Sequence, residues 1–402
     1  MTPEIKQQIE QIRRGEVPEG FKHNSASVMP CDWNTCDFHE VATIQSGLVS
    51  PKEEPYCFMF HIGPDNIERD TGRIGNLKTA CELGLVSGKF YFDAGSIVYS
   101  KIRPNLNKVC IPNFEGICSA DCYSIKARAG IDRDYLFNLM LSFPFYRRAV
   151  ACSMRTGMPK INQDDLNAIP VVMPSQLEEQ QKIAAILTTQ DKVIELKERL
   201  LAEKQRQKKY LMQQLLTGKQ RLPGYKETWA TVELEEIFDY IQPTSYLVKS
   251  TNYSDTYSTP VLTAGKTFIL GYTNETKGIF SNVPVVIFDD FTTATKFVDV
   301  PFKVKSSAIK ILIAKKEFNI RFVYEAMQLI HFTVGNHERH WISQYSHVTI
   351  DVPCLEEQTA IAEILCTADH EIDLLQQELE QEKQKKKALM QLLLTGIVRV
   401  NE

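Results

Sequence analysis

The sequence has no apolar run that approaches the ~18 residues of a membrane-spanning helix. Its first residues, MTPEIKQQIEQIRRG, are polar and lack the apolar stretch of a signal peptide. Ten cysteines are present, but Cys31/Cys36 and Cys118/Cys122 do not have C-x-x-C spacing, and no paired histidines follow them. We therefore expect a cytoplasmic protein with free thiols, no bound metal and no cofactor of its own.

Catalytic motifs are missing as well. The stretch AGKT at 264–267 would need glycine at position 260 to form a phosphate-binding loop, and that position is Pro260. Asp289, Asp290 and Lys296 resemble part of a metal nuclease centre, but no further acidic residue and lysine stand at nuclease spacing. Neither the glycine-rich cofactor loop nor the Asn/Asp-Pro-Pro-aromatic motif of an adenine methyltransferase occurs. The sequence predicts no catalytic centre.

Size and charge limit the remaining function classes. The 402 residues allow two or three domains, and 43% hydrophobic and 24% charged residues are typical of a globular protein. The net charge of −4 argues against a free-standing, non-specific nucleic-acid binder. A local basic face remains compatible with this charge.

A long repeat is the most prominent feature that the sequence does have. Residues 177–218 and 355–396 are both 42 residues long, lie 178 residues apart, and are identical at 22 positions without a gap. Both begin with LEEQ, which places carboxylates at a helix N-terminus, and both end with LLTG, a helix stop with glycine after the last turn. The repeat predicts the same long helix twice.

Heptad spacing predicts that the two helices pack against each other along an apolar seam. In the second copy the seam positions are mainly Ile and Leu, for example Ile361, Leu365 and Ile372. In the first copy the seam is interrupted by polar residues such as Gln190 and Lys197. Neither helix is expected to be stable alone, because each needs the other to bury its stripe.

The repeat continues outside these helices. The N-terminal KQQIEQIRRGEVPEGF is similar to LMQQLLTGKQRLPGY at the end of the first long helix, so residues 1–24 read as the tail of a truncated third copy. The predicted order is an N-terminal helix (1–24), a variable domain (25–174), a long helix (175–218), a second variable domain (219–353) and a distal long helix (354–402). This is a pseudo-two-fold repeat, and the chain could close into a ring if the N-terminal helix docks near the C-terminal one.

The two variable regions are predicted to be mixed α/β (α+β) domains. Stretches such as FDAGSIVYSKI and NVPVVIFDDF indicate short strands between turns, and amphipathic patterns within 135–153 and 320–335 indicate helices after the sheet. The regions share this layout but little sequence. Similar spacers joined to different modules imply that the modules recognise different things.

With these features the chain resembles the specificity subunits of type I restriction-modification enzymes. The resemblance covers nearly the whole chain and rests on PSQLEEQQKIA and PCLEEQTAIA, the two LLTG ends, LPGY, SKIRPNLNK at 100–108 and TGMPKIN at 156–162. It implies two target recognition domains, each reading half of a split DNA site, separated by a pair of long antiparallel coiled-coil helices. It also implies docking of two adenine methyltransferase subunits and, through the complex, of restriction–translocase subunits, with no catalysis by this chain itself.

The second variable region departs from the family pattern. It has GNHERHWISQYS in place of TGMPKIN and IFDDFTTATKF in place of SKIRPN. Residue roles therefore cannot be transferred from one half to the other by sequence alone.

Candidate DNA contacts combine cations for phosphates with polar side chains for base edges. In the first region they are Lys101, Arg103, Asn105, Asn107, Lys108, Arg155, Thr156, Lys160 and Asn162. In the second region they are Thr263, Lys266, Tyr272, Thr292, Thr293, Lys296, Arg339, His340 and Trp341.

Positions that are identical in both long helices outside the seam are candidates for partner contacts. We expect them on the outer faces of the helices, where coiled-coil packing does not require identity, and we expect two identical partner subunits. The candidates are Gln180, Ala184, Met212, Gln358, Ala362 and Met390.

Two other functions remain open at this point. A coiled-coil scaffold whose domains bind proteins would suit the negative net charge. A self-sufficient nuclease would need an acidic metal centre that the sequence does not supply.

Overall fold

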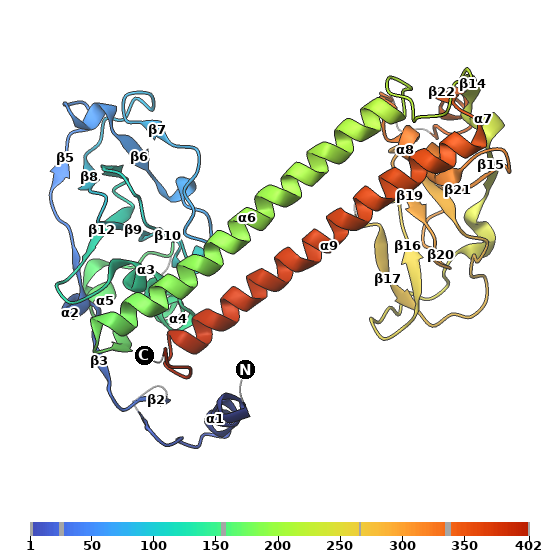
Figure 1. Cartoon of the computed structure of the whole chain (residues 1–402). Coiled ribbons are helices and arrows are strands. Elements are labelled where there is room, and N and C mark those ends of the chain that lie inside the picture. The colour runs from blue at the N-terminus through green and yellow to red at the C-terminus, as the bar shows by residue number, and fades with distance from the viewer. Residues whose placement is uncertain (1–2, 24–27, 154–157, 265–266, 334–338, 401–402) are drawn as a thin grey trace. The chain divides into compact units, whose positions relative to one another are not determined.

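The computed structural model describes residues 3–23, 28–153, 158–264, 267–333 and 339–400. The contacts divide the chain into two units, which are described separately below. Unit 1 contains Met1–Leu196 and Leu379–Glu402, and unit 2 contains Lys197–Glu378. Two long helices, α6 (Leu177–Leu215) and α9 (Leu355–Leu393), each contribute one part to unit 1 and the other part to unit 2 (Figure 1).

Unit 1 is a mixed α+β unit. Its short helices are α1 (Pro3–Arg13), α2 (Phe38–Val41), α3 (Arg133–Leu141), α4 (Phe143–Cys152) and α5 (Gln163–Asn167). Its strands are β1 (Phe21–His23), β2 (Val28–Pro30), β3 (Trp33–Asp37), β4 (Ala42–Ile44), β5 (Leu48–Val49), β6 (Phe60–Ile62), β7 (Lys78–Thr79), β8 (Lys89–Phe92), β9 (Ile97–Ser100), β10 (Val109–Cys110), β11 (Gly116–Cys118), β12 (Cys122–Ala127) and β13 (Pro170–Pro174).

Unit 2 has the same kind of composition. Its short helices are α7 (Leu234–Ile237) and α8 (Ile320–Met327). Its strands are β14 (Ala230–Glu233), β15 (Phe238–Ile241), β16 (Thr259–Leu262), β17 (Ile269–Thr273), β18 (Val285–Asp289), β19 (Thr295–Val298), β20 (Lys303–Val304), β21 (Ile309–Ala314) and β22 (Thr349–Val352).

Each unit has a four-stranded sheet with the same strand order, whereas a second, larger or smaller sheet differs between the units. The strand order β10-β9-β12-β4 in unit 1 is repeated as β19-β18-β21-β15 in unit 2. The second sheet has the order β5-β8-β11-β6-β7 in unit 1 but only β17-β16-β20 in unit 2. The antiparallel pair β3–β13 of unit 1 is likewise repeated as β14–β22 in unit 2. The duplicated layout predicted from the sequence is therefore present in these two sheets, and the divergence of the variable regions is concentrated in the remaining one.

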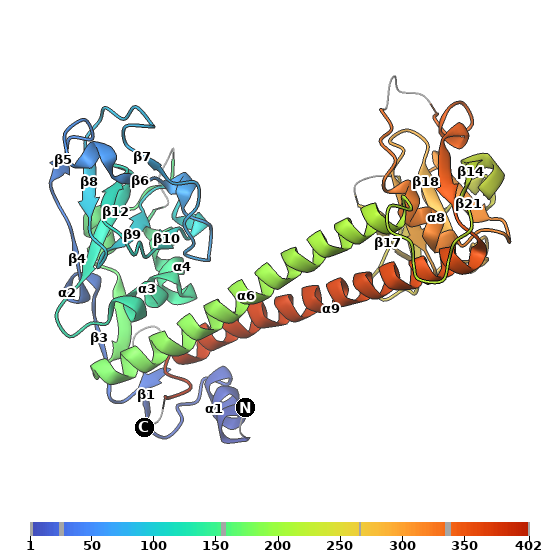
Figure 2. The ribbon, with the colours of Figure 1, turned by 45° about the horizontal axis from the view of Figure 1, so that its top comes forward.

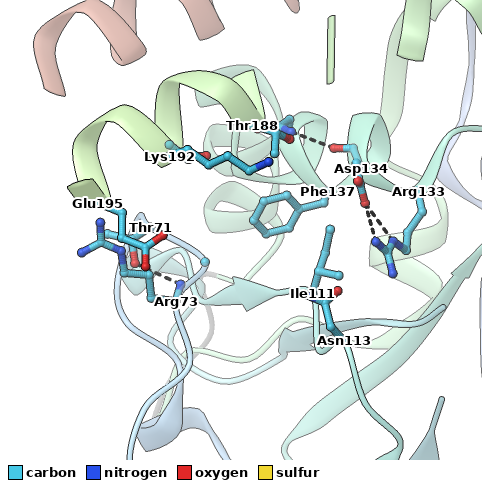
Figure 3. A pocket seen from close by; sticks show the side chains of 13 residues that line it. Thr71, Arg73, Ile111, Asn113, Arg133, Asp134, Phe137, Thr188, Lys192 and Glu195 are labelled. Carbon is cyan, nitrogen blue, oxygen red and sulfur yellow. Dashed lines mark hydrogen bonds and ion pairs between the residues drawn. The ribbon is translucent and has the colours of Figure 1, made fainter. Parts of the chain in front are cut away.

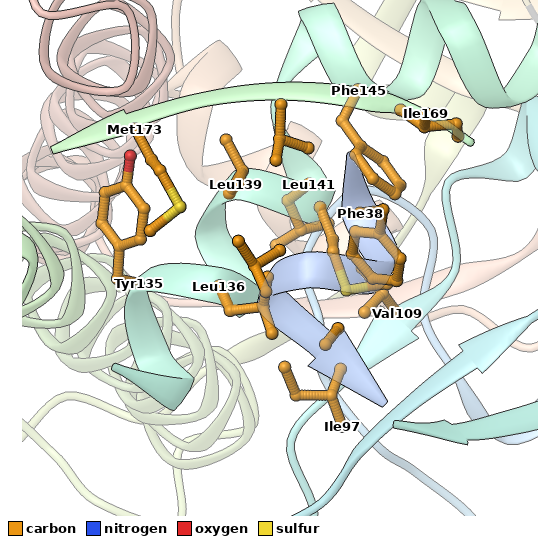
Figure 4. Close-up of a cluster of buried hydrophobic side chains, with 14 of the residues drawn as sticks. Phe38, Ile97, Val109, Tyr135, Leu136, Leu139, Leu141, Phe145, Ile169 and Met173 are labelled. Carbon is orange, nitrogen blue, oxygen red and sulfur yellow. The ribbon is translucent and has the colours of Figure 1, made fainter. Parts of the chain in front are cut away.

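The main core of unit 1 lies between the sheet β10-β9-β12-β4, the helices α3 and α4, and the first turns of α6. Phe38, Leu136, Phe145 and Met173 belong to this cluster of buried side chains (Figure 4). Ile183 and Leu187 of α6 and Leu393 and Leu394 at the end of α9 join the same cluster. Both helix ends are thus fixed to the unit by apolar burial, worth about 1.5–3 kcal/mol for each large side chain.

The long helices begin and end as their sequences predict. Glu178, Glu179, Glu356 and Glu357 lie in the first turns, where carboxylates interact favourably with the helix dipole. Gly218 and Gly396 follow the last turns with φ values of 66° and 71°, in the left-handed region that glycine tolerates best. Of the seam residues, Ile183, Leu187, Ile361 and Leu365 are buried.

A matching set of contacts fixes the end of each long helix to the start of the other. Arg399, after α9, donates hydrogen bonds to Glu179 at the start of α6 and to Asp32. Its guanidinium also lies 5.9 Å from the ring centre of Trp33. We call Arg399, Glu179, Asp32 and Trp33 the unit 1 clasp. Figure 2 shows the C-terminal segment beside β1.

Unit 2 repeats this arrangement 178 residues earlier. Arg221, after α6, donates two hydrogen bonds to Glu357 at the start of α9, at 2.8 and 2.6 Å. Its guanidinium lies 5.5 Å from the ring centre of Trp229. Arg399 thus takes in unit 1 the place that Arg221 has in unit 2.

Replacing Arg399 with alanine should destabilise the protein by about 1–2 kcal/mol, mainly because the largely buried Glu179 loses a charged donor; the contribution of exposed Asp32 is reduced by solvent screening. The hydrogen bond from Arg399 is the largest cause that lowers the pKa of Asp32. A lowered folded-state pKa stabilises the protein above the unfolded pKa, so this contribution should begin to fall below about pH 4 and be lost as pH falls through the lowered pKa of Asp32. Thermal unfolding at pH 7 and at pH 3 measures both effects. Arg206→Ala, at an exposed i,i+3 pair with Glu203, is the matched control and should change little.

Candidate nucleic-acid interface and partner surfaces

The loop after β9 brings together two basic segments that are about 60 positions apart in the sequence. The backbone N–H of Ile161 donates to the carbonyl of Lys101, and the N–H of Arg103 donates to the carbonyl of Pro159, at 2.9 and 2.8 Å. Ile102 and Lys160 also form an antiparallel bridge. The two candidate segments of the first region therefore form one surface, held by backbone hydrogen bonds that do not depend on the side chains.

This surface carries positive charge. Arg103, Asn105 and Lys160 are exposed. The Lys101 ammonium lies 5.2 Å from the ring centre of Tyr123. Burial lowers the pKa of Lys101, and the nearby Lys160 lowers it further. An anion bound beside Lys101 would stabilise the charged state that burial and the nearby Lys160 disfavour.

The remaining candidates of this loop support its shape. Asn107 is buried, and its side-chain amide donates to Asp70 Oδ1 and to the carbonyl of Leu141. The Lys108 ammonium donates to the carbonyl of Pro64 at 2.6 Å. Asn162 caps α5 by accepting a hydrogen bond from the backbone N–H of Asp165. Arg155 and Thr156 lie outside the described residues.

Backbone hydrogen bonds show which residues of the two domains are equivalent, which the sequence alone does not show. Lys101 donates from its backbone N–H to Asp121 and accepts from Ile161; Asp290 donates to Ala308 and accepts from His340 in the same way. Asp290 therefore occupies the place of Lys101, and exposed Arg339 occupies the place of Lys160.

The second domain has lost one of the two cations and replaced it with a buried acid. Asp290 and Lys310 are both buried and pair at 3.4 Å. The backbone N–H of Trp341 donates to Asp290 Oδ1. The side chains of His340 and Trp341 are also buried. His340 and Trp341 therefore pack in the core, whereas the sequence led us to expect both side chains at an exposed DNA-contacting surface.

The other second-region candidates lie in two places. Exposed Thr292 and Lys296 and half-buried Thr293 belong to the β18–β19 turn and its second strand. The Thr292 hydroxyl donates to Asp289 at 2.6 Å, so Asp289 is a turn-stabilising residue and not part of an open metal centre. Half-buried Tyr272 lies in β17 of the smaller sheet, and half-buried Thr263 directly follows β16. Lys266 lies outside the described residues.

Each unit has a groove between its domain helix and its long helix. In unit 1 it has a volume of about 350 Å³, and Ile111, Asp134, Phe137 and Lys192 line it together with Asp191 (Figure 3). In unit 2 the corresponding places hold Phe297, Arg321, Tyr324, His370 and Asp369. Acidic and basic side chains alternate in both grooves. A balanced lining does not attract phosphate, so we place the candidate DNA contacts on the loops, although Lys296 of β19 also lines the groove of unit 2.

The expectation that the matched helix positions lie on outer faces is wrong. Gln180, Ala184, Gln358 and Ala362 are buried, and Met212 and Met390 pack partly buried against the cores. Gln180 accepts a hydrogen bond from the backbone N–H of Asp132, and Gln358 accepts one from that of Asn319, at 2.9 and 2.8 Å. These identities are explained by the junction that each long helix makes with its own domain.

A different set of matched residues is exposed. Ile186 and its counterpart Ile364 are each 37% exposed, and Leu196 and Leu374 are 63% and 46% exposed. Thr189 and Thr367 are also exposed and lie between them. At ~100° per residue the three positions in each helix fall within an arc of roughly 80°, on a face different from the seam. We call them the exposed stripes. A comparison of the two helix copies could have found these residues, but only after the identical positions that are buried had been distinguished from those that are exposed.

Metal and thiol chemistry has little support in the described residues. One group of three possible ligands occurs among them, formed by Glu233, Glu235 and His347. The His347 Nδ1 lies 3.2 Å from Glu233 and 3.4 Å from Glu235, in a partly exposed arrangement that the hydrogen bond between His347 and Glu233 explains. Burial raises the pKa values of the Cys110, Cys118 and Cys122 thiols, which makes them unreactive. None of the helices in the described ranges is long and apolar enough to cross a membrane.

Comparisons with known proteins agree with this architecture. The family model described as "Type I restriction modification DNA specificity domain" matches residues 30–204 and again 226–384. The specificity subunit of the Escherichia coli type I restriction enzyme EcoR124I/EcoR124II is 52% identical over 139 residues, which is 33% of this chain and 34% of that protein. The specificity subunit of the E. coli enzyme EcoDI is 41% identical over 181 residues, 45% of this chain and 38% of that protein. The matches thus cover well under half of either relative.

A more distant relative matches along nearly the full length. The putative MjaX specificity subunit of Methanocaldococcus jannaschii is 26% identical, with 95% of this chain and 97% of that protein covered. Among solved structures, a type I restriction-modification S subunit from M. genitalium has a TM-score of 0.64 at 14% identity and covers 92% of this chain and 97% of its own. At that identity the structural match concerns the fold alone.

Proposed function

Because the chain belongs to the family of type I restriction-modification DNA specificity domains, we propose that it is the DNA sequence-specificity subunit of a type I restriction-modification complex. The observation that carries this proposal is the pair of equivalent loops after β9 and β18. Each loop is joined by a backbone hydrogen bond to a second segment that carries an exposed cation, which is Lys160 in the first domain and Arg339 in the second. Each domain, as a target recognition domain, would read one half of a split double-stranded DNA site.

The chain would supply recognition and no catalysis. The carboxylates that resembled a nuclease centre, Asp289 and Asp290, are occupied by hydrogen bonds from the chain itself. Methylation of adenine and ATP-dependent cleavage would therefore come from methyltransferase and restriction subunits docked on this chain.

The spacer between the domains would be an antiparallel coiled coil of α6 and α9. Contacts between the helices support this: Gln190 donates to Glu382 in unit 1, and Lys197 and Lys204 pair with Glu378 and Glu371 in unit 2. From one pair to the next the residue number increases along α6 and decreases along α9, as antiparallel packing requires. A rigid spacer of fixed length would set the distance between the two half-sites.

Replacing Lys160 with alanine should weaken binding to all DNA sequences alike, because an exposed lysine beside Lys101 is suited to a phosphate. Titration of the assembled complex with specific and scrambled duplexes at several salt concentrations tests this. The slope of log K against log salt should fall by about 1. Lys160→Arg is the matched control and should keep both affinity and slope. Loss of discrimination at one base pair, with an unchanged slope, would instead make Lys160 a base-reading residue.

The exposed stripes would each dock one methyltransferase subunit. Their apolar side chains lie among exposed charged residues, and their identity in both helices fits two copies of one partner. Each stripe lies within its own unit, at positions 186–196 in unit 1 and 364–374 in unit 2.

Replacing Leu196 with lysine should remove one of two methyltransferase subunits, because a charge in the middle of an apolar contact is costly to desolvate. Native mass spectrometry of the reconstituted complex should then change from two partner copies per chain to one. Leu374→Lys should have the same effect, and the two together should remove both copies. Ala202→Lys, on another exposed face of α6, is the control. Two copies retained in the double variant would contradict this surface.

A further inference from the structure

The seam between α6 and α9 is not symmetric, although the helices are copies of each other. Lys197 and Lys204 of α6 pair with Glu378 and Glu371 of α9, each at 2.7 Å, within unit 2. The counterparts of these residues, 178 positions away, have different chemistry. Lys197 and Lys204 correspond to Leu375 and Glu382, and Glu371 and Glu378 correspond to Val193 and Leu200.

A second α6 in the place of α9 would remove both acidic partners. Lys204 would then face Val193, and Lys197 would face Leu200. Four lysines, two from each helix, would lie on the seam beside apolar side chains and without a carboxylate. Gln190, which now bonds to Glu382, would come opposite Lys204 and offer a neutral oxygen in place of a carboxylate, so holding four lysines on the seam would cost side-chain entropy and hydration with little in return.

A second α9 in the place of α6 would be less favourable still. Glu371, which now accepts from Lys204, would face Glu382, and this would happen twice because the pairing is two-fold. Glu378 would face Leu375. Like charges on a helix seam repel each other and are the usual means by which coiled coils reject wrong partners.

We propose that these charges make each long helix specific for the other, so that α6 of one chain pairs with its own α9 and not with the same helix of a second chain. The partner that α6 accepts is α9, and a second α6 is rejected, as is a pair of α9 helices. This inference rests on the helix pair of the proposed function and adds its selectivity.

The full chain allows a direct test by exchanging the four seam residues. One variant gives α6 the residues of α9: Val193→Glu, Lys197→Leu, Leu200→Glu and Lys204→Glu. A second gives α9 the residues of α6: Glu371→Val, Leu375→Lys, Glu378→Leu and Glu382→Lys. A third combines all eight substitutions, so that the helix pair is again complementary.

We expect the first two variants to lower the Tm by roughly 3–6 °C and the third to return to within about 2 °C of the unmodified chain. The third variant tests the proposal even if the first two do not fold. A third variant as unstable as the first two would overturn it, and so would first and second variants as stable as the unmodified chain. Mapping methylated adenines with the third variant keeps the proposed function separate: a bipartite motif supports that function whatever the Tm values are.

Discussion

Replacing residues 25–174 with the first recognition domain of another family member is expected to change one half of the methylated DNA motif and leave the other half intact. The physical reason is the junction between domain and spacer. Gln180 of α6 bonds to the backbone of Asp132, Gly130 and Pro174, and not to their side chains. A different domain with the same backbone path would therefore fit the same helix.

The reciprocal exchange is the control for this experiment. Replacing residues 219–353 should change only the other half-site, because Gln358 makes the corresponding backbone contacts with Asn319 and Pro353. Methylation mapping in cells reads both halves at once. If either exchange altered both half-sites together, the domains would not be independent reading modules.

Lengthening both long helices by one turn should widen the gap between half-sites and leave their sequences unchanged. Leu196 and Lys197 lie opposite Glu378 and Leu379, as the Lys197–Glu378 pair indicates. Four residues inserted after Leu196 and four after Glu378 would therefore lengthen the paired helices at matched points. The added length is ~6 Å, with a rotation of ~40° beyond a full turn. DNA rises ~3.4 Å per base pair, so we expect one or two additional unread base pairs.

A single residue inserted at each point gives the contrasting result. It rotates everything beyond it by ~100° and moves the apolar seam away from its partner. Buried residues such as Ile194 and Ile372 would then be exposed, and we expect loss of assembly in place of a new spacing. An unchanged gap in the four-residue variant would contradict the role of the helices as a ruler.

Much of the fold could be predicted from the sequence because the relevant signals are local. Heptad spacing and the LLTG stops predict α6 and α9, and turn residues around FDAGSIVYS and NVPVVIFDD predict β9 and β18. The amphipathic pattern at 135–153 was only partly informative. Pro144, in the first turn of α4, separates the predicted helix into α3 and α4.

The candidate sites were harder to predict because they depend on contacts between distant segments. Nothing in the letters IFDDF and HERHW indicates that Asp290 replaces Lys101; the backbone hydrogen bond from His340 supplies that register. Identity between the two helix copies was also ambiguous. Gln180 is identical to Gln358 because of a buried junction, whereas Leu196 is identical to Leu374 on an exposed face. The burial of each side chain distinguishes these two reasons for identity, and burial cannot be read directly from the sequence.

The central claim is that this chain directs adenine methylation to a split DNA site. Single-molecule sequencing of methylated adenines, in cells that carry the chain and its methyltransferase partner, tests it most directly. We predict a bipartite motif, with two specific half-sites separated by a fixed number of unread base pairs, that disappears when this chain is deleted. A continuous motif, or methylation that persists unchanged without the chain, would contradict the claim.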